Sequence, residues 1–310
     1  MSRSKELNKV FLPYKYSRNK NLFKFFKIDI NKKKNILKII RLIKKFRITH
    51  VVNFASQSMV AESWNRPIDW YRTNIIAQIE FHEELRKIKF LKKYIHISTP
   101  EVYGDTQGII KENTLYKPST PYAVSRAACD MHLLSFFKNY NFPVIFTRAA
   151  NVYGPCQQLY RIVPKTILSL KKKKKLFLHG GGYSKRSFIF IDDAMQATYK
   201  VCLSGKIGSI YHISTNHRIR IKDLVRKIFK LTKNLDKKKS SDYLMKKYII
   251  STKDRPGKDK LYGLDSRKIE KELKWHPKVS IDDGLKKTID WIDDNLSYLK
   301  NLSMEYTHKK

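Results

Sequence analysis

Short β-rich runs alternate with longer helical patterns along most of this chain, and this alternation limits the folds that it can adopt. Strands separated by helices of this length indicate βαβ units, in which parallel strands build one sheet and the connections are right-handed. The sequence therefore predicts an α/β fold. We expect strands over residues 23–28, 50–54, 94–98, 144–148, 176–179, 187–191 and 209–213. We expect helices over residues 33–45, 69–87, 122–140, 162–171, 192–203, 221–231, 266–273 and 281–299.

The length of 310 residues is enough for about two domains with a sizeable core. Residues 232–247 are polar, rich in lysine and aperiodic, so we expect a loop there between substructures. No apolar run approaches the roughly 18 residues of a membrane-spanning helix, and the basic start of the chain lacks the apolar segment of a secretory signal. Cys129, Cys156 and Cys202 are odd in number and lack CxxC spacing, which favours reduced thiols in a cytoplasmic protein.

The chain is strongly basic, with 65 Lys and Arg against 27 Asp and Glu and a net charge of +38. Such a balance is compatible with a nucleic-acid binder, which would retain DNA or RNA in a strongly salt-dependent manner. However, Lys outnumbers Arg about three to one and is spread over the whole sequence. The one dense run, Lys171–Lys175, follows an apolar helical pattern, and cations are favourable at a helix C-terminus without any ligand. We therefore expect a solvated basic surface and no specific nucleic-acid partner.

Side chains suited to proton transfer follow one expected strand and open the next long helix. Thr99 and Glu101 stand at the carboxyl end of the strand over 94–98, where open α/β sheets bind their ligands. Tyr122 and Arg126 are four residues apart and therefore lie on one face of the helix over 122–140. A cation beside a phenol favours the phenolate and makes Tyr122 a better base. Together these residues indicate a site for acid–base chemistry.

Two other segments match known sites only in part. GGGYSK over 180–185 lacks the glycine before lysine that a P-loop needs, and it leads into an expected strand. HEELR over 82–86 begins like a zinc-binding HExxH helix but has Arg86 in place of the second histidine. The nine histidines are otherwise scattered, so the sequence predicts no metal site.

Several further motifs carry a family resemblance: VNFASQS (52–58), TN (73–74), RAANVYGP (148–155), RSFIFIDD (186–193), DRPGKD (254–259) and YGLD (262–265). With the segments around Thr99 and Tyr122, they resemble the extended short-chain dehydrogenase/reductase family, and within it the nucleotide-sugar 4,6-dehydratases. The resemblance extends from about residue 27 to about residue 292. It implies a doubly wound parallel sheet of the Rossmann type over residues 1–150, to which the strand over 187–191 returns. Residues 151–310 would then form mainly a smaller α/β domain that binds the sugar nucleotide.

The glycine-rich opening of the family is missing, because no glycine precedes Gly104. Only glycine lets backbone N–H groups approach a pyrophosphate closely, so a strand, glycine turn and helix normally open such a fold. By resemblance, the family's first βαβ unit, about 40–55 residues, is absent, and residues 2–4 would end the loop after the second strand. On this view Met1 is a start inside the gene. We expect the chain as given to fold poorly, or to be part of a longer or disrupted gene product.

The resemblance also implies a mechanism. Tyr122 would take the proton of the sugar C4 hydroxyl while hydride passes from C4 to NAD⁺, and Thr99 would hydrogen-bond that hydroxyl. Once a 4-keto group has acidified the C5 proton, Glu101 would remove it as water leaves C6, and the hydride would return to C6. Arg126 would assist Tyr122 from the position where the family usually has lysine. Pro100 stands where the dehydratases often have an acidic residue, so another group would have to protonate the departing hydroxyl.

The remaining site residues are also implied by the resemblance. The cofactor, NAD with NADP left open, would contact Asp29, Ile30, Phe54, Ala55, Ser56, Asn74, Tyr122 and Arg126. The nucleotide-diphosphate sugar would contact Ser58, Asn151, Arg186, Arg255 and Tyr262. TDP-glucose is favoured, although GDP-mannose and CDP-glucose dehydratases share the chemistry. The family implies a homodimer formed by the helices over 69–87 and 122–140. A nucleotide-sugar epimerase and a truncated pseudoenzyme that binds sugar nucleotides without turnover remain as alternatives.

Overall fold

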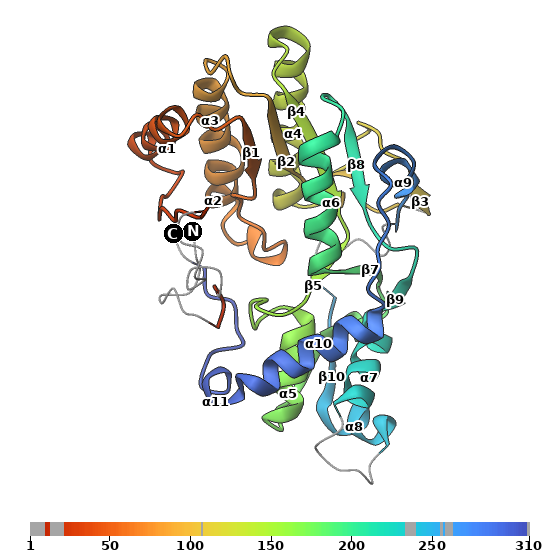
Figure 1. The fold of residues 1–310 in the computed structure, drawn as a ribbon. Helices are drawn as coiled ribbons and strands as arrows, with labels where there is room; N and C mark the ends of the chain where they lie inside the picture. Colours follow the sequence, from red (N-terminus) through yellow and green to blue (C-terminus); the bar gives the residue numbers. More distant parts are fainter. Residues whose placement is uncertain are drawn as a thin grey trace.

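The computed structural model describes residues 10–12, 22–106, 108–232, 240–254, 257 and 263–308. Its central element is a parallel sheet in the order β1-β2-β4-β8 (Figure 1). The four strands are β1 (His50–Asn53), β2 (Lys93–Ile97), β4 (Val144–Ala149) and β8 (Ile210–Ile213). This sheet confirms the α/β class that the alternation predicted.

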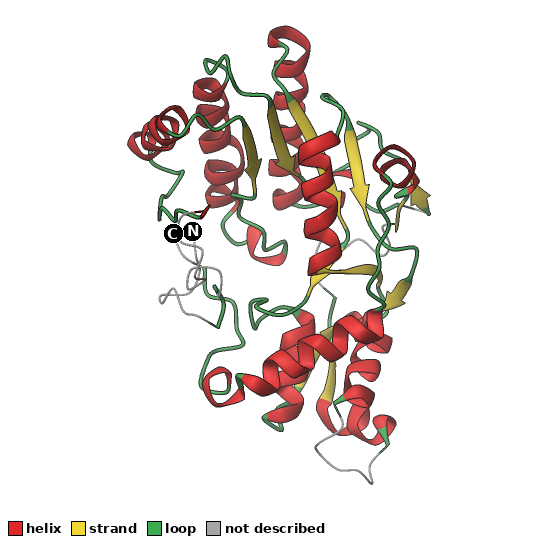
Figure 2. Cartoon of the chain, viewed as in Figure 1, coloured by secondary structure: helices red, strands yellow, loops and turns green. Residues whose placement is uncertain are grey.

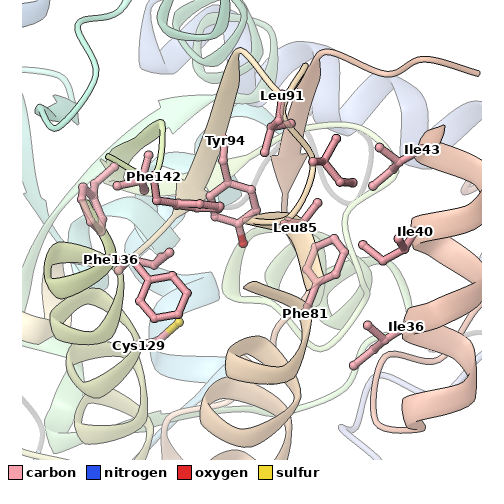
Figure 3. Close-up of a cluster of buried hydrophobic side chains, with 14 of the residues drawn as sticks. Ile36, Ile40, Ile43, Phe81, Leu85, Leu91, Tyr94, Cys129, Phe136 and Phe142 are labelled. Carbon is pink, nitrogen blue, oxygen red and sulfur yellow. The ribbon is translucent and has the colours of Figure 1, made fainter. Parts of the chain in front are cut away.

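Helices cover both faces of this sheet, as Figure 2 shows. Tyr94 and Ile95 are neighbours on β2 and both are fully buried, because successive strand residues point to opposite faces and each face is covered. Tyr94 packs in one apolar cluster (Figure 3), and Ile95 packs in another on the opposite face. The first face carries α1 (Lys33–Lys45), α3 (Ala77–Leu85) and α4 (Pro121–Tyr140), and the second carries α6 (Ile191–Ser204) and α9 (Arg267–Leu273). The sheet is therefore doubly wound, as predicted.

The helix expected over 69–87 is one continuous run with a wider turn inserted in it. α2 (Pro67–Tyr71) leads into a π-helical turn over Arg72–Ile76, and α3 follows directly. Single π-helical turns inside α-helices are frequent at functional sites. Here the turn contains the buried Thr73 and Asn74. Among the described residues, none of the helices combines the length and the apolar character that crossing a bilayer requires.

A second part of the molecule lies below the sheet in the view of Figure 1. It contains a sheet in the order β5-β7-β9 and a parallel pair of β6 and β10, and its helices pack around a separate apolar cluster. The strands are β5 (Asn151–Tyr153), β6 (Leu176–His179), β7 (Lys185–Phe190), β9 (Arg218–Arg220) and β10 (Ile249–Thr252). The helices are α5 (Ile162–Lys171), α7 (Ile221–Leu231), α8 (Ser241–Tyr248), α10 (Ile281–Asp294) and α11 (Leu296–Leu299). A short pair, β3 (Ile109–Ile110) and β11 (Gly263–Leu264), lies apart from both.

The strand expected over residues 23–28 is absent, because residues 23–29 form neither a strand nor a helix. A strand needs a hydrogen-bonded neighbour, and within the described residues β1 pairs only with β2. Phe23, Phe25 and Phe26 are instead exposed. Residues 2–4, which were expected to end a preceding loop, lie outside the described residues.

Two further expectations about elements were wrong. The strand expected over 187–191 does not pair with the main sheet, since β7 lies between β5 and β9. The loop expected over 232–247 contains α8, because Ser240 caps the helix by accepting a hydrogen bond from the Tyr243 amide at 3.2 Å, and Met245 and Tyr248 are buried. The division of the chain at residue 150 stays a prediction.

Candidate active site

Two Thr-Pro dipeptides place the predicted catalytic residues. Thr99 caps a short 3₁₀ helix over Pro100–Tyr103 at the carboxyl end of β2, and Thr120 caps α4 by accepting a hydrogen bond from the Ala123 amide at 3.1 Å. In each case proline occupies the first helical position, where its fixed φ is favourable and its missing N–H is not needed. Because both helices begin at the same end of the sheet, Glu101 and Tyr122 lie near Thr99.

The Thr99 hydroxyl connects the other two groups. It donates a hydrogen bond to the Glu101 carboxylate, and it also hydrogen-bonds to the Tyr122 phenol. Thr99 and Tyr122 are buried, and Glu101 is half-buried. The structure thus brings together a hydroxyl, a carboxylate and a phenol whose residues are as far as 23 positions apart in the sequence.

The pKa of Tyr122 lies above its usual value, mainly because the phenol is buried and secondarily because the Glu101 carboxylate is close. Arg126, the Thr99 hydroxyl and Arg161 act in the opposite direction. Arg126 therefore favours the phenolate, as the sequence predicted, but burial outweighs it.

Arg126 is buried although it was predicted to reach the cofactor. Its guanidinium donates to the Ile97 carbonyl and lies 3.2 Å from His96 Nε2. Its Nη1 is buried and has no hydrogen-bond partner among the described residues. Nη2 is thus fixed against β2, whereas Nη1 can still donate a hydrogen bond to a ligand.

Asn74 holds the loop after β1 against α4. Its Oδ1 accepts from the Gln57 amide at 2.8 Å, and its Nδ2 donates to the Gln57 carbonyl at 3.0 Å and to Ser125 Oγ at 2.9 Å. This side chain comes from the π-helical turn over Arg72–Ile76, which packs against α4. Through these bonds Asn74 fixes the loop that contains Ala55 and Ser56.

Arg161 is a candidate site residue that the sequence analysis missed. It precedes α5, its Nη2 donates to Ser58 Oγ at 3.1 Å, and it lowers the pKa of Tyr122. The only local signal was an arginine immediately before an expected helix. Its proximity to Ser58 and Tyr122 depends on how the second part of the molecule packs on the first, which no local pattern encodes.

The other predicted binding residues are distributed around this centre. Asp29 and Ile30 precede α1, and the Asp29 carboxylate accepts from the Asn31 amide at 3.0 Å. Phe54 follows β1 and is 52% exposed. Asn151 begins β5 and Arg186 lies in β7, where it faces Ile219 of β9. Arg255 and Tyr262 lie outside the described residues.

A doubly wound parallel sheet with a threonine at one strand end, and a tyrosine followed one helical turn later by a basic residue, defines the class of extended short-chain dehydrogenases/reductases. Within it, the chain belongs to the GDP-mannose 4,6 dehydratase family, whose model matches residues 2–288. The predicted resemblance is confirmed.

Individual relatives agree with this assignment. The human dTDP-D-glucose 4,6-dehydratase is 33% identical over 285 residues, which are 92% of this chain and 79% of the relative. The crystal structure of dTDP-glucose 4,6-dehydratase from Bacillus anthracis in complex with NAD has a TM-score of 0.78 and 29% identity, and covers 91% of this chain and 83% of its own. UDP-glucuronic acid 4-epimerase from Bacillus cereus, in complex with UDP-glucuronic acid and NAD, has a TM-score of 0.79 and 27% identity, with 91% and 85% covered.

Proposed function

We propose that this chain is a nucleotide-sugar 4,6-dehydratase, which converts an NDP-hexose into the NDP-4-keto-6-deoxyhexose. The observation that carries the proposal is the contact of Thr99 with both Glu101 and Tyr122. It places an acid–base group for the C4 hydroxyl beside a separate base for C5, which an elimination requires and a simple C4 epimerisation does not. The human and bacterial dehydratases among the relatives support the same activity.

In this mechanism Tyr122 accepts the proton of the C4 hydroxyl, and Thr99 orients that hydroxyl through its own hydrogen bond. Arg126 and Arg161 favour the phenolate that carries out the transfer. A 4-keto group then acidifies the C5 proton, and the Glu101 carboxylate removes it as hydroxide leaves C6. Pro100 has no acidic proton, so the departing hydroxide takes a proton from the newly formed Glu101 carboxyl or from solvent, and C5 regains a proton from the same sources when hydride adds to C6.

NAD, when bound, accepts hydride from C4 and returns it to C6. Arg126 fits such a group, because its Nη1 is a buried donor without a partner in the described part of the chain. The pyrophosphate side of the family contains a glycine turn, whereas the first glycine of this sequence is Gly104. The proposal includes contacts of NAD with six residues: Asp29, Ile30, Phe54, Ala55, Ser56 and Asn74. It also includes contacts of the sugar nucleotide with five residues: Ser58, Asn151, Arg186, Arg255 and Tyr262.

The test is the variant Glu101→Gln, assayed with dTDP-glucose and NAD⁺. A dehydratase should lose formation of the 4-keto-6-deoxy product by about 10²- to 10⁴-fold, while absorbance from NADH still appears because C4 oxidation does not need Glu101. The control is Glu83→Gln, which changes a surface carboxylate of α3 that pairs with Arg86 and should leave turnover intact.

Other outcomes of the same assay reject the proposal. If Glu101→Gln has little effect and the wild type interconverts C4 epimers, the chain is an epimerase. If the wild type binds dTDP-glucose but neither reduces NAD⁺ nor releases product, it is a pseudoenzyme. Calorimetric titration of NAD⁺ into the wild type separates absent cofactor binding from absent chemistry.

A homodimer is part of the proposal. The α2–α3 run and α4 lie next to each other and expose Ile68, Ile76, Val124 and Met131. Apolar side chains gathered on adjacent helices are suited to an isologous interface. Sedimentation of the wild type should give a dimer that Met131→Lys weakens. Three free cysteines support a reducing, cytoplasmic compartment.

A further inference from the structure

Residues 302–308 form an extended segment after α11 that packs on the protein through alternate side chains. In Figure 1 this segment leaves α11 and rises toward the helices of the main sheet. Its half-buried residues are Leu302, Met304, Tyr306 and His308, and the three residues between them are exposed. In an extended backbone, such alternation means that one side of the segment faces the protein. The segment forms neither a helix nor a strand, so its side-chain contacts hold it in place. We call it the strap.

The first half of the strap packs on the second part of the molecule. Its first two half-buried side chains contact the apolar cluster of that part. The Glu305 carboxylate pairs with Lys165 Nζ of α5 at 2.8 Å. The ring of Tyr306 lies edge-on to the ring of Tyr160, just before α5, with the centroids 5.3 Å apart and the planes at 75°. This is a preferred geometry for two aromatic rings.

The other end of the strap lies on α2, next to the main sheet. The His308 ring is stacked on the ring of Trp70, with the centroids 5.1 Å apart and 14° between the planes, and Trp70 is fully buried. His308 Nε2 donates to the Asp69 carboxylate at 2.8 Å, and its Nδ1 lies 3.1 Å from the Tyr306 hydroxyl. Both ring nitrogens of His308 therefore have partners, and the strap is held at both ends.

The strap spans the boundary between the two parts that Arg161 also spans. Tyr160, on which Tyr306 packs, immediately precedes Arg161, and the Arg161 guanidinium lies over the Tyr160 ring at 5.6 Å from its centroid. The same guanidinium donates to Ser58 Oγ at 3.1 Å and lowers the pKa of Tyr122. A displacement of Tyr160 would therefore displace the cation that acts on Tyr122.

We propose that Tyr306 and His308 are positioning residues, which hold the second part of the molecule against α2 and thereby keep Arg161 beside Ser58 and Tyr122. The kinetic part of this inference rests on the proposed function, in which Tyr122 exchanges a proton with the sugar. The aromatic contacts at the two ends carry the role, because the ion pair of Glu305 is exposed and such pairs contribute little.

A competing role for the strap is general stabilisation, in which it only covers the Trp70 ring. The two roles differ in what they predict. A stabilising cover would raise the free energy of unfolding of the whole chain without acting through any one residue of the site. A positioning strap acts through Arg161, so its effect on turnover should disappear when Arg161 is replaced.

The first test does not depend on activity. It compares amide hydrogen exchange in the full wild-type chain and in Tyr306→Ala. We expect faster exchange over residues 157–161, where the Arg161 amide donates to the Gln158 carbonyl at 3.0 Å, and unchanged exchange in β2 and β4. Thr307→Ala changes an exposed position of the strap and should behave as the wild type. Unchanged exchange over 157–161, or equal acceleration in β2 and β4, overturns the proposal even if the chain is an active dehydratase.

The second test is a double-mutant cycle of Tyr306→Ala and Arg161→Gln, assayed with dTDP-glucose and NAD⁺. With Arg161 present, Tyr306→Ala should lower kcat/KM by about 10-fold, because a small misplacement of a site residue can cost up to about 10²-fold. In the Arg161→Gln background the same change should cost less than about threefold. Tyr306→Phe retains the ring that contacts Tyr160 and should restore most of kcat/KM.

Equal losses from Tyr306→Ala in both backgrounds, or no loss in either, would overturn the proposal. Melting temperatures of all variants identify any that fail to fold. Should Tyr306→Ala be among them, His308→Ala, which removes only the contacts with α2, replaces it in both tests. An inactive wild type would count against the proposed function, but the hydrogen-exchange result would still decide whether the strap holds residues 157–161.

Discussion

Acid should destabilise this protein from near pH 6.5, and His212 allows the size of the effect to be worked out. His212 lies on β8 and is buried, with Nε2 at 2.8 Å from Tyr103 Oη and Nδ1 at 3.2 Å from the Asp265 carbonyl. Burial, and secondarily the Arg148 guanidinium, lower its pKa to about 3 from a usual value of 6.5. The unfolded chain therefore binds a proton at a pH at which the folded protein does not.

The sign and size follow from proton linkage. Because the folded pKa of His212 is depressed, its contribution is fully present above pH 6.5 and is lost as the pH falls from 6.5 toward 3. At pH 5.5, one unit below the unfolded value, the loss is about 1.4 kcal/mol. His82 is fully buried and its pKa is also lowered well below 6.5, chiefly by burial, so it adds a loss of the same sign.

The assay is urea unfolding of the wild type and of His212→Asn at pH 7.5, 6.5 and 5.5. We expect the wild type to lose stability at each step, and the variant, although less stable at pH 7.5, to lose about 1.4 kcal/mol less between pH 7.5 and 5.5. His217→Asn, a change at an exposed site after β8, is the control and should follow the wild type. A variant whose pH dependence equals that of the wild type would refute the argument from the buried imidazole.

Three further perturbations have defined outcomes. Tyr122→Phe should lower kcat by about 10²- to 10⁴-fold with a smaller change in KM, measured by product formation from dTDP-glucose; an unchanged kcat would remove Tyr122 from the mechanism. Asp130→Asn should lower the free energy of unfolding in urea by about 3–5 kcal/mol, because it leaves the fully buried Arg148, 2.9 Å away, without its counter-ion. Asp223→Asn, at a more exposed ion pair, should lower it by less than about 1 kcal/mol. Gly104→Ala should lower the melting temperature, since φ is +71° and the added Cβ would lie 2.2 Å from a backbone oxygen.

Helices with a strong apolar stripe could be predicted with their boundaries. α1, α5 and α7 begin and end at the expected residues, because each presents apolar side chains at one-face spacing and has basic residues in its last turn. α8 was missed since its two buried residues, Met245 and Tyr248, are too few to stand out in a lysine-rich segment. The hydrophobic pattern of a segment therefore predicts a helix only when most of one helix face is buried.

Strands depended more on their surroundings. β2 and β4 were predicted because each contains β-branched and aromatic residues (Tyr94 and Ile95, Val144–Phe146), which suit strands that are buried on both faces. Residues 23–28 have a similarly apolar composition, yet they form no strand, because strand formation requires a neighbour with free backbone groups. Composition therefore identified strand candidates, while pairing decided which of them became strands.

The residues of the candidate site also differ in whether local sequence or tertiary packing places them. Thr99, Glu101 and Tyr122 could be predicted because each stands at a strand end or helix start that its own sequence specifies through a Thr-Pro cap. Arg161 could not, since it does not belong to such a cap. It reaches Ser58 only through a contact between the two parts of the molecule.

Pro100 has both a local structural role and a consequence for the proposed chemistry. As the first residue of the short helix after Thr99 it is buried, and its fixed φ helps to place the Glu101 carboxylate against the Thr99 hydroxyl. An acidic residue there would offer a proton to the departing hydroxide, but it would also set a second carboxyl next to Glu101 and raise the pKa of one of them. With proline, Glu101 is the only carboxyl on the short helix over Pro100–Tyr103. The proposed elimination therefore depends on one well-placed base, and the departing oxygen must obtain its proton from that same carboxyl or from water.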